Sequence, residues 1–150
     1  MEFRLARRQD LTAKTCQTIL SDAEEYCKEV PQDKVSPWEI LNTFINFVQG
    51  RIKDPQFWLA IKEDKLAGYM ITQAITQDNE PAVFIREAYI QKSKRADGVL
   101  PYSLEVLYNK AKESGAKAII CQRYGDSKAF GRLMSKHGYE YKATEFRRVI

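Results

Sequence analysis

Three strand-like segments in the middle of the chain constrain its fold more than any other feature of the sequence. Two polar turns, residues 62–65 and 77–81, separate segments that are rich in apolar, aromatic and β-branched side chains. Extended segments joined by short polar turns favour antiparallel hairpins. The three segments are residues 57–61, 66–76 and 83–90. We therefore expect a three-stranded antiparallel sheet in the middle of the fold.

The pattern changes after the third segment, where a helix and another strand follow. Apolar residues recur at helical spacing up to Gly115, at Leu100, Leu104, Leu107 and Ala111. The short apolar run at residues 118–121 is typical of a strand that is covered on both faces. A strand, a helix and a strand in that order predict a right-handed parallel crossover, so the sheet should be mixed.

Two helices are expected before the three segments, after a short first strand around residues 3–5. The first helix ends before Pro31. The second begins with the capping pattern Ser36-Pro37-Trp38-Glu39 and ends at Gly50. Its expected apolar face consists of Trp38, Leu41, Phe44, Ile45 and Val48.

A last helix over about residues 126–137 should end at Gly138, and a final strand should cover residues 139–149. Together the elements predict a single α/β domain over residues 1–150, with a mixed, mostly antiparallel sheet flanked by about four helices. A chain of this length buries about 70% of its unfolded surface on folding. It therefore needs no metal or disulfide to form a core.

Charge and cysteine content narrow the classes of partner and site. The 24 basic and 20 acidic residues give a net charge of +4, which permits an anionic partner without requiring one. No RNA- or DNA-binding motif accompanies this charge. Three widely spaced cysteines argue against a disulfide framework, and a single histidine argues against zinc. No apolar run approaches the roughly 18 residues of a membrane helix, and we expect a cytoplasmic location.

The segment between the third strand and the next helix is the best candidate for a binding site. Ligands of mixed α/β sheets bind at the carboxyl ends of strands, next to crossover helices. Lys92, Lys94 and Arg95 bring positive charge to the start of a helix, whose N-terminal N–H groups favour an anion such as phosphate. Gly98 allows a ligand to approach the backbone closely. The alternative is a solvated basic turn that binds nothing.

The order of the elements and the sequence of this loop resemble the GNAT superfamily of N-acetyltransferases, over nearly the whole chain. Family members carry Arg/Gln-x-x-Gly-x-Gly/Ala between the fourth strand and the third helix, and residues 95–100 are Arg-Ala-Asp-Gly-Val-Leu. Residues 113–120 look like the end of the family's third helix with the fifth strand, and residues 136–139 like the end of its fourth helix. The resemblance implies a GNAT-like acyl-CoA N-acyltransferase fold.

The resemblance also implies a site for acetyl-CoA, whose pyrophosphate is wrapped by this loop in the family. The coenzyme-binding residues that it implies are Tyr89, Ile90, Lys92, Lys94, Arg95, Ala96, Asp97, Gly98, Val99 and Ser127. Three positions depart from the family pattern. Leu100 replaces a small residue, Asp97 places a negative charge near the phosphates, and Met134 or Leu133 stands where a tyrosine commonly protonates the coenzyme sulfur.

Glu87 is the best candidate for a general base, because some family members have a catalytic glutamate on this strand. Strand alternation predicts that it shares one face with Val83, Ile85 and Tyr89. The alternative role is an ion pair with Arg86 or with a charge on a neighbouring strand. Tyr124 follows the fifth strand and could line the acceptor site or supply an acid, unless it only packs in its loop.

These observations leave two main hypotheses. The first is an acetyl-CoA-dependent N-acetyltransferase that acts on a primary amine, on either a small molecule or a protein. The second is a non-catalytic GNAT-like module with a protein-interaction or structural role, a kind that also occurs among phage-encoded members. The departures at Asp97, Leu100 and Met134 motivate it. Nucleic-acid binding rests only on basic residues, and a homodimer is compatible with either main hypothesis.

Overall fold

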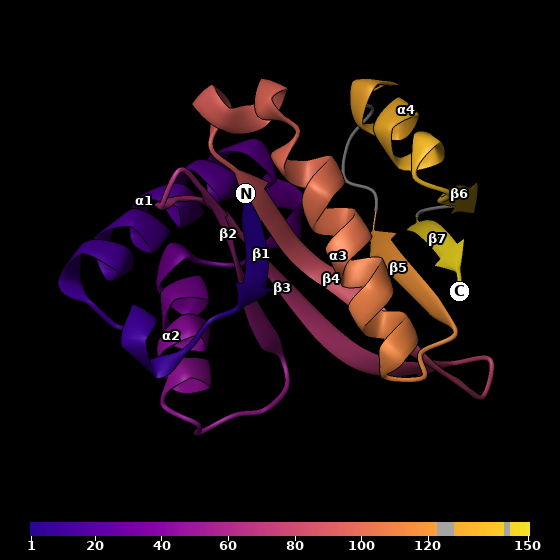
Figure 1. Cartoon of the computed structure of the whole chain (residues 1–150), viewed down its shortest axis with the longest axis horizontal. Helices are drawn as coiled ribbons and strands as arrows, with labels where there is room; N and C mark the ends of the chain where they lie inside the picture. The colour runs from indigo at the N-terminus through magenta and orange to yellow at the C-terminus, as the bar shows by residue number, and fades with distance from the viewer. Residues whose placement is uncertain (123–127, 143–144) are drawn as a thin grey trace.

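The computed structural model describes residues 1–122, 128–142 and 145–150. The strands in these ranges form one continuous sheet (Figure 1). Within these ranges, seven strands lie in the order β1-β2-β3-β4-β5-β7-β6. The first four strands pair with one another in antiparallel fashion: β1 (Glu2–Leu5), β2 (Gln56–Lys62), β3 (Lys65–Gln77) and β4 (Glu80–Ile90). The others are β5 (Ala118–Gln122), β6 (Glu140–Lys142) and β7 (Glu145–Val149). The predicted central antiparallel strands are confirmed.

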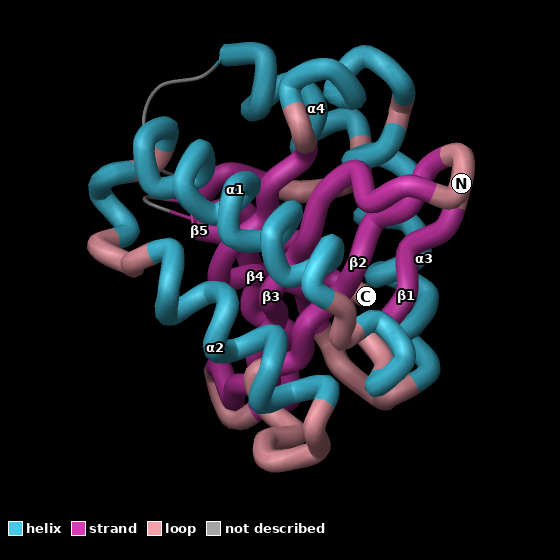
Figure 2. Tube along the Cα trace, turned by 90° about the vertical axis from the view of Figure 1, so that its left-hand side faces the viewer, coloured by secondary structure: helices cyan, strands magenta, loops and turns pink. Residues whose placement is uncertain are grey.

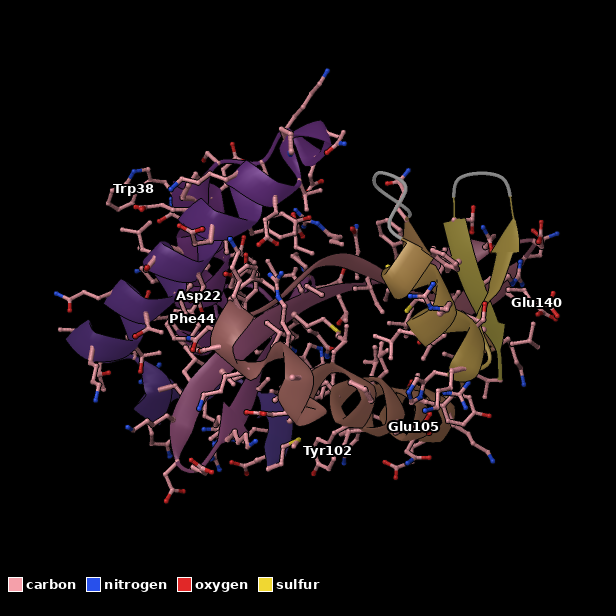
Figure 3. The ribbon with its side chains drawn as sticks, turned by 90° about the horizontal axis from the view of Figure 1, so that it is seen from above. Asp22, Trp38, Phe44, Tyr102, Glu105 and Glu140 are labelled. Carbon is pink, nitrogen blue, oxygen red and sulfur yellow. The ribbon has the colours of Figure 1, made fainter. Side chains whose placement is uncertain are left out.

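Helices cover both faces of the sheet (Figure 2). The helices α1 (Ala13–Glu29) and α2 (Pro37–Val48) pack on one face, and α3 (Val99–Glu113) packs on the other. The helix α4 (Lys128–Lys136) joins the α3 side, because its Met134 belongs to the buried cluster that contains the apolar face of α3. Figure 3 shows this division, with Tyr102 and Glu105 on one side and Asp22 and Phe44 on the other.

The capping pattern at residues 36–39 starts α2 as expected. The Ser36 hydroxyl accepts a hydrogen bond of 3.2 Å from the Glu39 backbone N–H, and Pro37 is the first helical residue. Phe44 is fully buried, but the expectation that Trp38 also faces the core is wrong, because its side chain is 62% exposed. Trp38 lies in the first turn of α2 and points away from the sheet (Figure 3).

The parallel crossover is confirmed, whereas the single final strand is not. α3 connects β4 to β5, and these two strands pair in parallel. The region expected to form one strand over residues 139–149 contains two, since β6 and β7 pair with each other in antiparallel fashion. β7 also pairs with β5, so β6 lies at the outer edge of the sheet.

A β-bulge in β4 overturns one further expectation. Glu87 is opposite Ile71 on β3, whereas Ile85 is opposite the next residue, Thr72, so Arg86 is an extra residue without a partner on β3. An extra residue reverses the alternation of side chains beyond it. Ile85 therefore packs on the α3 side while Tyr89 packs on the α1 and α2 side. Consequently Glu87 and Tyr89 do not share a face with Ile85.

Candidate functional site

The strands β4 and β5 part at the bulge. Their parallel pairing covers Val83 to Ile85 on β4 and ends where Ile85 meets Cys121 on β5. β4 continues to Ile90, and the two strands diverge toward the top of Figure 1. Beyond Ile85, no described strand pairs with β4 on its β5 side. Backbone N–H and C=O groups along such an edge need partners, which an extended ligand can supply.

The loop that follows β4 leads directly into α3. It forms the 3₁₀ helix η3 (Lys92–Asp97), and Gly98 then adopts a left-handed conformation with φ 74°. Only glycine takes up this conformation without strain. No side chain caps the first turn of α3, and a Cβ atom built on Gly98 would meet nothing within 4 Å. The helix N-terminus is thus open to an anion at the point where the sequence predicted one.

The basic side chains of this loop are partly paired with the protein's own carboxylates. Arg95 Nη2 donates to both carboxylate oxygens of Glu29, at 3.0 and 2.8 Å, and Lys92 Nζ lies 3.7 Å from Glu29. Arg95 Nε also donates to the Ile90 carbonyl at 2.8 Å, and its guanidinium lies 5.2 Å from the centre of the Tyr89 ring. These contacts tie the end of α1 to the loop.

The other residues predicted to bind coenzyme occupy different environments. The carboxylate of Asp97 lies 2.9 Å from Lys62 Nζ, and hydrogen bonding to this lysine lowers the pKa of Asp97. β2 therefore compensates its negative charge. Ala96 is exposed, whereas the side chain of Val99 is fully buried, so only its backbone could contact a ligand. Tyr89 and Ile90 are likewise buried. Ser127 lies outside the described residues.

The carboxyl group of Glu87 is buried beside the point where β4 leaves β5. The residue is 3% exposed, and one carboxylate oxygen lies 3.5 Å from Arg86 Nε. The predicted alternative role as an Arg86 partner is thus present in the structure. Burial nevertheless dominates and raises the pKa of Glu87 to about 7, with further increases from Asp33 and Glu39 and an opposing effect from Arg86. Such a carboxyl group can both accept and release a proton near neutral pH.

Residues that the sequence did not single out surround Glu87. Tyr26 on α1 donates a hydrogen bond of 2.7 Å to Asp33 in the 3₁₀ helix η2 (Pro31–Asp33). A side-chain hydrogen bond connects Asp33 to Glu87. Asp22, also on α1, accepts a hydrogen bond of 3.2 Å from Gln91, and burial raises its pKa to about 6. No local pattern in the sequence marks Asp33 as a neighbour of β4.

Comparisons with known proteins bear on this arrangement. No family model and no curated protein matches the sequence. Among solved structures, the PaiA N-acetyltransferase from Thermoplasma acidophilum in complex with coenzyme A matches with a TM-score of 0.70, at 15% identity over 99% of this chain and 98% of that chain. Ribosomal-protein-alanine N-acetyltransferase from Brucella melitensis matches with a TM-score of 0.69, at 13% identity over the full length of both chains.

A chain of the NatC complex bound to Gag peptide and CoA also matches, with a TM-score of 0.73 at 10% identity over 99% of this chain and 98% of that chain. The chain has the GNAT fold. The fold expected from the resemblance is therefore confirmed, at a sequence identity of 13–15% to three of the solved structures. At this identity the likeness concerns the fold and not the reaction.

Two GNAT-derived expectations concern the fourth helix and the segment before it. Met134, at the position where a GNAT tyrosine commonly lies, is 1% exposed and packs in the core. A thioether has no proton to donate, and neither has the alternative, Leu133. Tyr124, the other predicted catalytic residue, lies outside the described residues.

The described residues also form a surface depression that lies apart from the predicted site. A depression of about 360 Å³ lies near the opposite end of α1 from Glu29 and is lined by Arg8, Leu11, Gln49 and Arg51. None of the predicted site residues lines it. Within the described ranges, no cluster of three metal-binding side chains is present. No described helix has both the length and the apolar composition needed to cross a membrane.

Proposed function

We propose that this chain is an acetyl-CoA-dependent N-acetyltransferase that acetylates a primary amine. The observation that carries the proposal is the position of Glu87: a buried carboxyl group with a pKa of about 7 lies where β4 parts from β5. An amine is a nucleophile only in its neutral form, so a base with this pKa is suited to the task. The GNAT fold supports the same reading.

The loop after β4 is proposed to bind the pyrophosphate of acetyl-CoA. Gly98 leaves the N-terminus of α3 open, and Lys92, Lys94 and Arg95 supply positive charge. Ala96, Asp97 and Val99 would contribute through their backbones, and Ser127 is proposed as a further coenzyme-binding residue. The edge of β4 at Tyr89 and Ile90, where Arg95 Nε now donates to the Ile90 carbonyl, would pair with the amide groups of the extended pantetheine arm. Arg95 would exchange Glu29 for phosphate.

In the proposed reaction, Glu87 takes a proton from the acceptor ammonium group. The neutral amine then attacks the thioester carbonyl carbon, the carbon–sulfur bond breaks, and the amide nitrogen loses its second proton to the thiolate. A thiol has a pKa near 8.5, so the thiolate leaves without a strong acid. The absence of a donor at Met134 is therefore compatible with turnover, and Tyr124 is proposed to act as the acid by relaying this second proton to the sulfur.

Binding of acetyl-CoA is the direct test. At a concentration about 100-fold above Kd, a ligand stabilises the native state by about 2.7 kcal/mol, which raises Tm by several degrees for a chain of this size. We expect this shift for the intact chain and its loss in Arg95→Glu and Gly98→Pro. Release of free thiol from acetyl-CoA should then depend on an added primary amine. An unchanged Tm in millimolar acetyl-CoA would contradict the proposal.

The second candidate, a non-catalytic GNAT-like module, is favoured by one observation. Arg95, whose charge would bind the phosphates, already donates hydrogen bonds to Glu29. In a non-catalytic module this ion pair would be a permanent structural contact. This candidate predicts no amine-dependent thiol release with any acceptor. Turnover of a single amine at a rate that depends on Glu87 would exclude it.

A further inference from the structure

A small polar cluster interrupts the apolar layer between the sheet and the helices α1 and α2. Its members come from four elements: Tyr26 on α1, Asp33 in η2, Tyr69 on β3 and Glu87 on β4. Tyr26 donates to Asp33 at 2.7 Å, and Asp33 is hydrogen bonded to Glu87. Tyr69 lies among the same apolar residues as Tyr26, and burial, followed by the charge of Glu87, raises the pKa of Tyr69.

Two oxygen atoms of this cluster are buried without a hydrogen-bond partner in the part of the chain that the structure describes. They are Tyr69 Oη and Glu87 Oε2, on residues that are 1% and 3% exposed; Glu87 Oε2 makes the 3.5 Å ion-pair contact with Arg86 Nε but accepts no hydrogen bond. A buried polar atom without a partner is costly, and its presence in a native fold calls for an explanation. Both atoms can accept hydrogen bonds, so a ligand that brings N–H donors would satisfy them.

The charges around the cluster favour a cation. Asp33 and Glu39 both disfavour ionisation of Glu87, and Arg86 is the opposing positive charge. A second positive charge would oppose the effect of Asp33 and Glu39 and favour the ionised form of Glu87. A primary ammonium group combines this charge with three N–H donors, whereas an uncharged or anionic group does not.

Asp33 also gives the cluster a connection to the surface. Tyr26, Tyr69 and Glu87 are buried, but Asp33 is only half-buried in the short connection between α1 and α2. Asp33 is therefore the member of the cluster that solvent reaches. We propose that Asp33 is a specificity-determining residue of the acceptor site, which selects positively charged primary amines through the paired carboxyl groups of Asp33 and Glu87.

This inference rests on the proposed function and names its substrate class. The ammonium group would bind between the two carboxyl groups and transfer one proton to Glu87, which leaves a neutral amine and a neutral Glu87. The titratable and charged groups that face Glu87 are Tyr26 and Cys27 on α1, Asp33, Glu39 on α2, Tyr69 on β3 and Arg86.

The test compares three acceptors on the full-length wild-type chain and on two variants, Asp33→Asn and Asp78→Asn. Butylamine is a cation at neutral pH, 4-aminobutyrate adds a carboxylate, and aniline is an uncharged amine. We expect the wild-type chain to prefer butylamine. Asp33→Asn should raise KM for butylamine roughly tenfold or more, as loss of a charged hydrogen bond implies, with a small change in kcat and in coenzyme affinity. Asp78→Asn, at an exposed turn, should leave KM unchanged.

A preference for aniline or 4-aminobutyrate, or an unchanged KM in Asp33→Asn, would overturn the inference. If Asp33→Asn does not fold, Tyr26→Phe is used instead, because this change removes only the hydrogen bond from Tyr26 to Asp33. A KM increase of a few-fold then supports the inference, and an unchanged KM overturns the inference. If the chain does not bind acetyl-CoA, the proposed function fails. Titration of the chain with butylammonium then tests the ammonium site separately. Binding that depends on Asp33 supports the site, and absence of binding overturns it.

Discussion

Arg95 Nη2 donates to both carboxylate oxygens of Glu29, at 3.0 and 2.8 Å, across a sequence separation of 66 residues. The carboxylate of Glu29 thereby holds the guanidinium near the N-terminus of α3. Both side chains remain partly exposed, at 44% and 30%. A phosphate group would compete with Glu29 for this cation.

Glu29→Gln should therefore bind CoA more tightly than the wild-type chain. An exposed ion pair contributes about 0.2–1 kcal/mol, so we expect an increase in affinity of up to roughly fivefold. Isothermal titration calorimetry measures this change. Glu25→Gln is the matched control, because Glu25 pairs at 3.3 Å with Lys28 on the same helix instead of with Arg95. Equal or weaker binding by Glu29→Gln would show that the pair does not oppose the coenzyme.

Burial of Glu87 should make the fold less stable as pH rises. Its pKa is raised from 4.5 to about 7, so between these values the native state holds a proton that the unfolded chain has lost. Stability from this group is full below about pH 4.5 and is lost as pH rises through 7, by on the order of 3 kcal/mol. Asp22, with a pKa raised to about 6, acts in the same direction.

Urea unfolding of the wild-type chain and Glu87→Gln at pH 5 and pH 8 checks this prediction. The amide cannot ionise, so the variant should lose less stability between the two values and exceed the wild-type chain at pH 8. Parallel unfolding curves with the same difference at both pH values would mean that Glu87 titrates normally. Glu63→Gln, at the exposed β2–β3 turn, controls for the loss of a surface carboxylate.

The same carboxyl group should govern the pH dependence of acetyl transfer. As a general base, Glu87 must be ionised, so kcat/KM should rise with pH through about 7. Glu87→Gln should lower kcat by about 10²–10⁴ and remove this rise. Rates of thiol release at saturating acetyl-CoA, from pH 5.5 to 9, give the comparison. A variant that keeps the wild-type profile would assign the base to another group.

Gly68 on β3 should tolerate no side chain. A Cβ atom there would collide with the backbone carbonyl of Tyr89 and lie 2.9 Å from Ile90 Cδ1. We expect Gly68→Ala to destabilise the fold by roughly 1–3 kcal/mol, because the obstacle includes backbone of the adjacent strand. Gly131→Ala is the control, since nothing lies within 4 Å of its Cβ position and alanine favours a helix. Thermal unfolding that ranks the two variants equally would contradict this account.

Features that depend on local pattern were predictable from the sequence. The central hairpins, the crossover through α3 and the start of α2 each have nearby signals, such as polar turns, apolar periodicity and the Ser36 cap. The basic loop at the start of α3 was also predictable, because Lys92, Lys94, Arg95 and Gly98 stand next to a helix start. In each case a few neighbouring residues determine the structure.

Features that depend on pairing between distant segments were not predictable. The bulge at Arg86 follows from the register of β4 against β3, and no glycine marks it. The reversal between β6 and β7 falls in a stretch without glycine or proline, the usual turn signals. The contacts of Glu29 with Arg95 and of Asp33 with Glu87 form only when α1 and η2 pack on the sheet.

The extra residue in β4 makes the length of this strand as important as its composition. Without Arg86 the side chains of β4 would alternate regularly along the whole strand. Each of the side chains 87–90 would then point to the opposite face of the sheet. The carboxyl group of Glu87 would then enter the apolar layer beneath α3, and Ile90 would face α1. A one-residue deletion here should therefore be worse tolerated than any substitution of Arg86, because it changes the destination of four side chains at once.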